Sequence, residues 1–232
     1  MSLLLLLACG RPGQQQADDP HHYAEALAAI AADPTATAAA CAAISATRLR
    51  DDCLAAGAEA LAPASPDKAR AACADISGAL LADECHFMVA ERLREPTLCD
   101  KAGRFRDDCR LHLLQQTTAA AKPAAPDDPA LAALIARSGF EDDDPRALTL
   151  VFRHALGARA PLDLSGCERS ISEEWCVRAG EGLLNDRLNH ARDTGAISEA
   201  WCSGERDSVP SLRYTPHPAL DATVARRSDL CP

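Results

Sequence analysis

Cysteine is the residue type whose spacing carries the most chemical information in this chain. The sequence has 11 cysteines among 232 residues, and a cysteine can form a disulfide, bind a soft metal ion or act as a nucleophile. Ten remain when Cys9 is set aside, and an even number is typical of disulfide-bonded proteins in oxidising compartments. They fall into pairs along the sequence: Cys41 and Cys53, Cys73 and Cys85, Cys99 and Cys109, Cys167 and Cys176, and last Cys202 and Cys231.

The spacing within the first four pairs predicts a turn between the two cysteines. Twelve residues of unbroken helix span about 18 Å, whereas a disulfide needs Cα atoms within about 7 Å. Each of these pairs encloses turn or cap residues, for example Ser77-Gly78 between Cys73 and Cys85. Local pairing therefore predicts a short helix, a tight turn and a longer helix, with a disulfide across the turn. Cys202 and Cys231 are then expected to bond each other and hold the C-terminal end.

The residues around the cysteines repeat. Cys41-Ala-Ala-Ile-Ser is similar to Cys73-Ala-Asp-Ile-Ser, which lies 32 residues later. The second cysteine of each of the first four pairs follows acids or an aromatic, as in Asp51-Asp52-Cys53 and Glu174-Trp175-Cys176, and an apolar helical pattern comes after it. We interpret these as four degenerate copies of one helical hairpin, with a period typical of helical arrays. The acids are expected in the first turn of the longer helix, where the helix dipole favours negative charge.

Three other uses of the cysteines are open at this point. They could pair between units, which spacing alone does not exclude. They could bind zinc, although there is no C-x2-C pair and only His86 and His112 lie beside a cysteine pair. They could hold copper(I) between helices, although Met1 and Met88 are the only methionines. We favour the disulfides and predict no metal site and no cofactor.

The composition favours an all-α fold. Hydrophobic residues make up 47% of the chain but aromatic residues only 3%, and 49 residues are alanine, which favours helices over strands. The core is therefore expected to be lined with alanine. Steps such as Asp33-Pro34 place a capping residue before a proline suited to the first helical position. Helices are predicted over 20–32, 34–46, 50–62, 67–77, 81–94, 97–102, 105–120, 129–138, 145–157, 165–170, 173–192, 196–202 and 218–228, in a solenoid-like or bundled array.

Charge and motifs argue against several functions. A net charge of −10 argues against nucleic-acid binding, which needs basic surface to neutralise phosphates. The chain has no G-x-S-x-G, P-loop, H-E-x-x-H or Rossmann glycine pattern. Its seven histidines are scattered, and His190 lies in a polar helical stretch that explains it without a site. We assign no catalytic residue and expect a non-enzymatic protein.

The N-terminus suggests export. Leu6-Leu7-Ala8-Cys9 resembles the lipobox of bacterial lipoproteins, and this resemblance implies that Cys9 is acylated and becomes the mature N-terminus. The preceding segment has no Lys or Arg, and its apolar run, Leu3 to Leu7, is shorter than the usual one; a leader truncated by a start codon placed too far downstream explains both. No stretch approaches the roughly 20 apolar residues of a spanning helix, so membrane attachment is expected through this anchor alone. By the same resemblance, Gly10 favours the outer membrane.

The expected organisation follows from these segments. Residues 1–8 are the signal peptide, 9–19 a flexible tether, 20–118 the N-terminal stapled repeats, 119–130 a linker, and 131–232 a helical region with an irregular tail. The predicted function is that of a lipid-anchored envelope protein, facing the periplasm or the cell surface, that presents its helical face to a protein or envelope partner. The alternative is a periplasmic carrier that holds a ligand or metal between helices.

Overall fold

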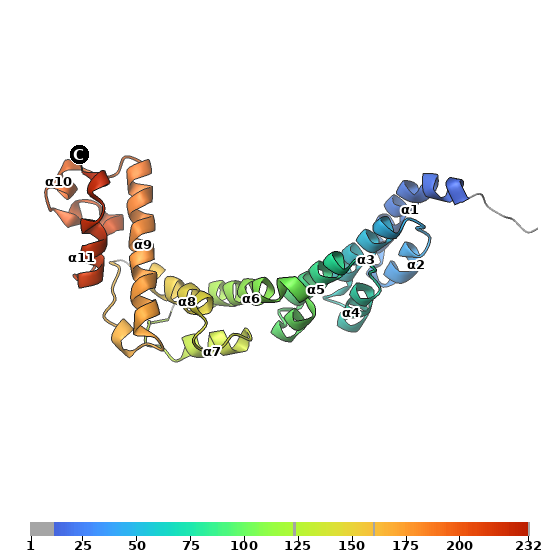
Figure 1. Ribbon diagram of the computed structural model, residues 1–232, viewed down its shortest axis with the longest axis horizontal. Coiled ribbons are helices and arrows are strands. Elements are labelled where there is room, and N and C mark those ends of the chain that lie inside the picture. Colours follow the sequence, from blue (N-terminus) through green and yellow to red (C-terminus); the bar gives the residue numbers. More distant parts are fainter. Residues whose placement is uncertain (1–11, 123, 160, 232) are drawn as a thin grey trace, which may run out of the picture. The chain divides into compact units, whose positions relative to one another are not determined.

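The computed structural model describes residues 12–122, 124–159 and 161–231, and within these ranges the protein is all-α (Figure 1). The only β contact among the described residues is an isolated parallel bridge between Leu162 and Tyr214. The predicted fold class, all-α with disulfide-stapled helical hairpins, is confirmed. The chain divides into two compact units, the first ending at Cys109 and the second beginning at Arg110.

The first unit alternates long and short helices. Its long helices are α1 (Pro12–Ala32), α3 (Thr47–Leu61) and α5 (Ala79–Leu93). The short elements between them are η1 (Pro34–Ala36), α2 (Thr37–Cys41), α4 (Pro66–Ala74), η2 (Pro96–Lys101) and η3 (Gly103–Phe105). Helix α3 packs against α1, α4 and α5. The helix predicted over 34–46 is shorter than expected, because it consists of η1 and α2 and ends at Cys41.

The second unit is built around one long helix, α9 (Glu173–Asp193). Helix α6 (Arg106–Ala120) begins in the first unit and continues into the second. The elements that follow are α7 (Ala130–Arg137), α8 (Pro145–Gly157), η4 (Cys167–Arg169), α9 (Glu173–Asp193), α10 (Glu199–Cys202), η5 (Arg206–Ser208), η6 (Pro210–Leu212), α11 (Pro218–Ala225) and η7 (Ser228–Leu230). Helix α9 packs against α8 on one side and α11 on another, as Figure 1 shows for these orange, yellow and red segments.

Five disulfides staple the helices. Each joins cysteines that are neighbours along the sequence: Cys41–Cys53, Cys73–Cys85, Cys99–Cys109, Cys167–Cys176 and Cys202–Cys231. Their Cα atoms lie 5.5–5.8 Å apart, which is possible because a turn separates the two helices of each hairpin. The first four link a short helix to the long helix that follows it.

Only some of the acids before the second cysteines lie where the sequence predicts. Asp107 and Glu174 do lie in the first turns of α6 and α9. Asp51 and Asp83, in contrast, lie in the second turns of α3 and α5, because these helices begin earlier, at Thr47 and Ala79. The expectation of a first-turn position is therefore wrong for these two residues.

The carboxylates of Asp51 and Asp83 accept hydrogen bonds from the turn before the next long helix. Asp51 accepts hydrogen bonds from the backbone N–H of Gly78 at 3.0 Å and from the hydroxyl of Ser77 at 3.2 Å. Asp83 accepts one from the backbone N–H of Arg104 at 3.2 Å. The first N–H groups of a helix have no acceptor within the helix. An aspartate of the preceding repeat supplies that acceptor and so holds the turn.

The same contact occurs one repeat earlier, in a helix that has no cysteine. Asp19 of α1 is 1% exposed and accepts hydrogen bonds from the backbone N–H groups of Ser45 at 2.7 Å and Ala46 at 2.8 Å. Asp19 and Asp51 are 32 residues apart, as are Asp51 and Asp83. Helix α1 is therefore a long helix of the same array, although the cysteine pattern does not include it.

The two units have different cores. In the first, the core contains cysteines and many small residues, including Ala58, Ala69 and Ala72, as the composition predicted. In the second, large side chains fill the core, and Phe152 and Trp201 are at most 2% exposed. The expectation of an alanine-lined core therefore holds for the first unit only.

The unit boundary differs from the predicted linker. It lies inside α6, not in the segment 119–130. The reason is that Leu111 and Leu114, together with Ala121 and Ala124, pack on the core of the second unit, so the end of α6 belongs to that core. Helix α1 begins at Pro12, so most of the segment 9–19 is helical in the structure.

Candidate interaction groove

The sequence-predicted residues are placed as follows. Cys9 lies outside the described residues. The other ten cysteines are all in disulfides, so none of them is a free thiolate that could bind copper(I). Among the described residues, no group of three or more His, Cys, Asp or Glu side chains is arranged to hold a metal ion.

The histidines beside the cysteine pairs are helix residues. His86 follows Cys85 in α5, and burial, together with the nearby Lys101, lowers its pKa. His112 lies in α6 on the same helix as Cys109. The structure brings neither of them into a metal-binding cluster.

A groove of about 590 Å³ lies in the second unit, between α6, α8 and the start of α9. Its lining residues come from three helices: Leu111 and Gln115 from α6, Pro145, Arg146, Thr149, Leu150 and Arg153 from α8, and Trp175 from α9. Its volume is within the range of about 300–1,000 Å³ that binding pockets typically have. We call it the Trp175 groove.

The lining combines an apolar surface with cationic side chains. Leu111, Leu150 and Trp175 are partly buried and pack against the core of the unit, so each has an apolar face on the core and another in the groove. Arg146 and Arg153 are the charged lining residues. No acidic side chain is among the eight lining residues, although the chain as a whole carries a net charge of −10.

Aromatic and ionic contacts hold the arginines around the groove. The Arg178 guanidinium lies 4.8 Å from the centre of the Trp175 ring and 2.8 Å from the Glu174 carboxylate. The Arg146 guanidinium lies 5.6 Å from the centre of the Phe140 ring. Such cation–π contacts are worth about 0.5–1 kcal/mol at exposed positions, which is enough to favour an orientation.

Carboxylates outside the lining balance part of the positive charge. Arg146 pairs with Asp144 at 2.9 Å, and Arg153 pairs with Asp186. Burial acts to raise the pKa of Asp144, but hydrogen bonds from the side chain of Arg146 and from the backbone N–H groups of Ala147 and Arg146 outweigh it and lower that pKa. Asp144 therefore stays ionised, caps α8 and orients Arg146.

The repeat position that Trp175 occupies also lines a groove in the first unit. Trp175 directly precedes the second cysteine of its pair, as Asp52 and Glu84 do in theirs. Asp52 and Glu84 line a groove of about 610 Å³ between α3 and α5, together with Leu80, which is 49% exposed. The same repeat position thus faces a groove in both units, and its chemistry changes from acidic to aromatic.

Comparison of the chain with protein-family models, with curated proteins and with solved structures finds no match. Within the described ranges, no helix combines the length and the apolar character needed to cross a membrane. The interpretation of the groove therefore rests on its own residues.

Proposed function

We propose that this protein is an exported, lipid-anchored helical-repeat protein without enzymatic activity, and that it binds a partner protein through the Trp175 groove. The observation that carries this proposal is the lining of the groove: apolar side chains and two arginines, without a carboxylate, in a strongly acidic chain. A partner segment with apolar side chains and acidic residues at its ends fits that lining by charge and by hydrophobicity.

The lining favours binding over catalysis. A hydroxyl nucleophile needs a neighbouring general base, usually a His, Lys, Asp or Glu side chain, and the eight lining residues include none of these. The one hydroxyl in the lining, that of Thr149, donates a hydrogen bond to the backbone carbonyl of Pro145 at 2.6 Å. Trp and Arg are the residues most enriched at the energetic centres of protein interfaces. Gln115 and Thr149 supply hydrogen-bonding groups that can orient a bound segment.

Two observations support the cellular location. Cys9 lies in the lipobox-like segment Leu6-Leu7-Ala8-Cys9, and lipid on a cysteine is an anchor that needs no spanning helix. The five disulfides are typical of a compartment outside the reducing cytosol. A lipoprotein facing the periplasm or the cell surface, with the outer membrane favoured, satisfies both.

Site-specific photocrosslinking in intact cells tests the groove. A benzoylphenylalanine at Thr149, inside the groove, is expected to crosslink one discrete partner, whereas the same probe at the exposed Asp142 is not. In the protein that carries the probe at position 149, Trp175→Ala and Arg153→Glu should each reduce the crosslink yield about tenfold, the usual cost of removing an interface anchor.

Arg153→Lys is the matched control, because it keeps the charge and should retain most of the crosslink. The crosslinked peptide of the partner should contain acidic and apolar residues. Equal yields in the Trp175→Ala and unsubstituted proteins, or a crosslinked segment rich in Lys and Arg, would contradict the proposed groove.

A further inference from the structure

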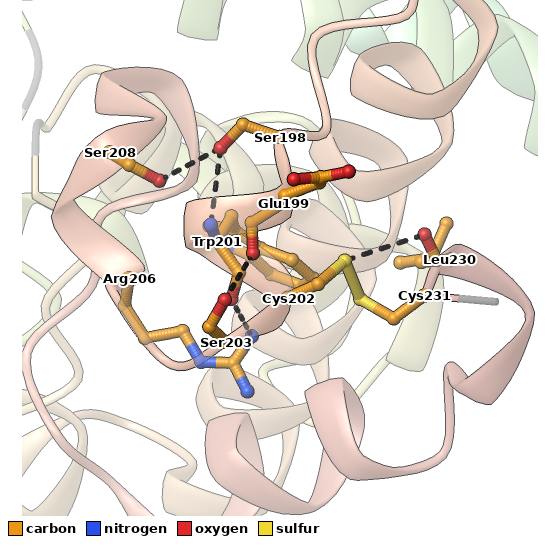
Figure 2. The surroundings of a disulfide bond; sticks show 9 residues. All are labelled: Ser198, Glu199, Trp201, Cys202, Ser203, Arg206, Ser208, Leu230 and Cys231. Carbon is orange, nitrogen blue, oxygen red and sulfur yellow. Dashed lines mark hydrogen bonds between the residues drawn. A yellow bond between two sulfur atoms is a disulfide. The ribbon is translucent and has the colours of Figure 1, made fainter.

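One of the five disulfides differs from the others in its exposure. The eight cysteines of the first four pairs are at most 1% exposed. Cys202 and Cys231, in contrast, are both only half-buried, and Figure 2 shows their disulfide between the short helix α10 and the end of the chain. Cys202 and Cys231 are therefore the most exposed of the ten disulfide-bonded cysteines.

The segment that this disulfide closes is also held by other contacts. It spans 29 residues, and Leu212, Leu220 and Leu230 within it are buried in the core of the second unit. Arg227, four residues before Cys231, donates hydrogen bonds to the side-chain oxygens of Asn185 at 2.8 Å and Asn189 at 2.9 Å. These contacts keep the segment against α9 when the disulfide opens.

The residues next to Cys202 are held in the same way. Trp201 is 2% exposed, and the Arg206 guanidinium lies 4.3 Å from the centre of its ring (Figure 2). The hydroxyl of Ser198 accepts a hydrogen bond from the backbone N–H of Trp201 at 3.1 Å and so caps α10. These contacts do not depend on the disulfide, so we expect both of its ends to stay in position after reduction and the opening to be local and reversible.

We propose that Cys202–Cys231 is a thiol–disulfide exchange site, opened and closed by an external dithiol while the other four disulfides remain intact. A thiolate of the dithiol attacks one Sγ atom, and a mixed disulfide forms. The Cys202–Cys231 bond breaks, and its electron pair leaves on the other Sγ atom as a thiolate. The second thiol of the dithiol, once deprotonated, attacks the mixed disulfide and releases the second cysteine thiolate.

The overall change is a transfer of two electrons. The dithiol is oxidised to its own disulfide, and Cys202 and Cys231 are reduced to two thiols after they take up protons. The reverse reaction, with an oxidised dithiol protein, restores the bond. This site shares no residue with the Trp175 groove and does not depend on the proposed binding function.

Time-resolved thiol labelling of the folded, oxidised protein tests the proposal. The full chain is treated with dithiothreitol without denaturant, quenched with an alkylating reagent at intervals, and mapped by mass spectrometry. Cys202 and Cys231 should be labelled at least about tenfold faster than the eight cysteines of the other four disulfides, because the buried pairs react only through opening of packed structure. Far-UV circular dichroism should not change during this fast phase.

A second arm uses reduced thioredoxin in place of dithiothreitol. Fast labelling in both arms identifies a protein dithiol as a competent source, and fast labelling with dithiothreitol alone restricts the site to small thiols. The double variant Cys202→Ser, Cys231→Ser should lose the fast phase and keep its helical signal. Labelling of all ten cysteines at one common rate, or earlier labelling of a buried pair such as Cys73–Cys85, would overturn the proposal.

Discussion

The carboxylate of Asp51, in α3, accepts a hydrogen bond of 3.0 Å from the backbone N–H of Gly78, the residue that precedes α5. Asp51 is 4% exposed, so this bond lies where water competes little. Asp19 and Asp83 make the corresponding contacts one repeat before and one repeat after. Each aspartate couples one repeat to the next, whereas each of the first four disulfides joins two helices within a repeat.

Asp51→Ala is therefore expected to destabilise the first unit. The substitution leaves the N–H of Gly78 and the hydroxyl of Ser77 without their acceptor. The free energy of unfolding should fall by about 1–2 kcal/mol, because an orphaned N–H group at a helix start costs that much. Chemical denaturation followed by circular dichroism measures the change.

Asp52→Ala is the matched control for this experiment. Asp52 is adjacent, also acidic and on the same helix, and it lines the same groove in the first unit, but the hydrogen bonds from Ser77 and Gly78 go to Asp51. Its loss should change the free energy of unfolding by no more than about 0.5 kcal/mol. Equal effects of the two substitutions would mean that Asp51 acts only through its charge and not through the turn before α5.

Much of the fold follows from local sequence signals. The pairing of Cys73 with Cys85 and the start of α8 at Pro145 depend on residues close together in the chain, so spacing, prolines and caps predict them. Helices α3 and α5 begin earlier than the sequence predicts, because Asp19 and Asp51, each 26–27 residues from its hydrogen-bonding partners, hold the turns before them. A contact at that distance has no local signature.

The groove could be predicted less well than the fold. The aromatic Trp175 stands out from the acids at its repeat position, and that signal was available. Its neighbours Leu111 and Thr149, however, come from two other helices, and only the packing of α6, α8 and α9 brings them together. Cys9, the one predicted modification site, lies outside the described residues and stays a prediction.

Two glycines of α9 should respond in opposite ways to substitution by alanine. A Cβ atom at Gly180 would lie 2.5 Å from Cδ2 of Leu164, which is buried, whereas one at Gly182 would meet only Nη1, at the far end of the long Arg153 side chain, at 3.0 Å. Gly180→Ala should lower the free energy of unfolding by about 1–3 kcal/mol through overpacking. Gly182→Ala should raise it by about 0.5–1 kcal/mol, because alanine favours helix over glycine.

The same denaturation measurement covers both glycine variants. Each differs from the unsubstituted protein by one methyl group in the same helix, so they control for each other. Stabilisation by Gly180→Ala would show that α9 does not approach Leu164 as closely as the structure indicates.

Removal of one buried staple should destabilise the protein by a predictable amount. Cys73 and Cys85 close a short loop, for which the loop-entropy estimate is about 3 kcal/mol. The double variant Cys73→Ser, Cys85→Ser should lose about that much in the free energy of unfolding, and full reduction should lower the melting temperature further. Unchanged thermal stability after full reduction would contradict a structural role of the disulfides.

Acid should weaken the C-terminal segment. Hydrogen bonds from Arg227 lower the pKa of Asp229 to about 2, from the ordinary value of 3.8. Because the folded pKa is the lower one, this pair contributes stability above pH 3.8 and loses it as the pH falls through about 2. The melting temperature of Asp229→Asn should therefore depend less on pH between about 4 and 2 than that of the unsubstituted protein.

Asp142→Asn, which changes an exposed acid, serves as the control for the pH series. Between about pH 4 and pH 2, its melting temperature should fall as steeply as that of the unsubstituted protein. An equally steep fall in Asp229→Asn would exclude a contribution from the Arg227–Asp229 pair.

Membrane attachment can be tested separately from binding. Cys9→Ser removes the thiol that the lipobox-like segment would acylate, so the protein should move from the membrane fraction to the soluble fraction. Cys202→Ser, a cysteine substitution far along the chain from the anchor, should leave fractionation unchanged. A membrane-bound Cys9→Ser variant would contradict the anchor.

The most direct measurement is the intact mass of the protein isolated from its native envelope and alkylated without reduction. An exported, lipid-anchored and disulfide-stapled protein should begin at Cys9, carry diacylglycerol on that residue, and show no alkylated cysteine among the eight that form the four buried disulfides. A chain that retains Met1, carries no lipid and takes up alkyl groups on those eight cysteines would contradict both export and the stapled repeat.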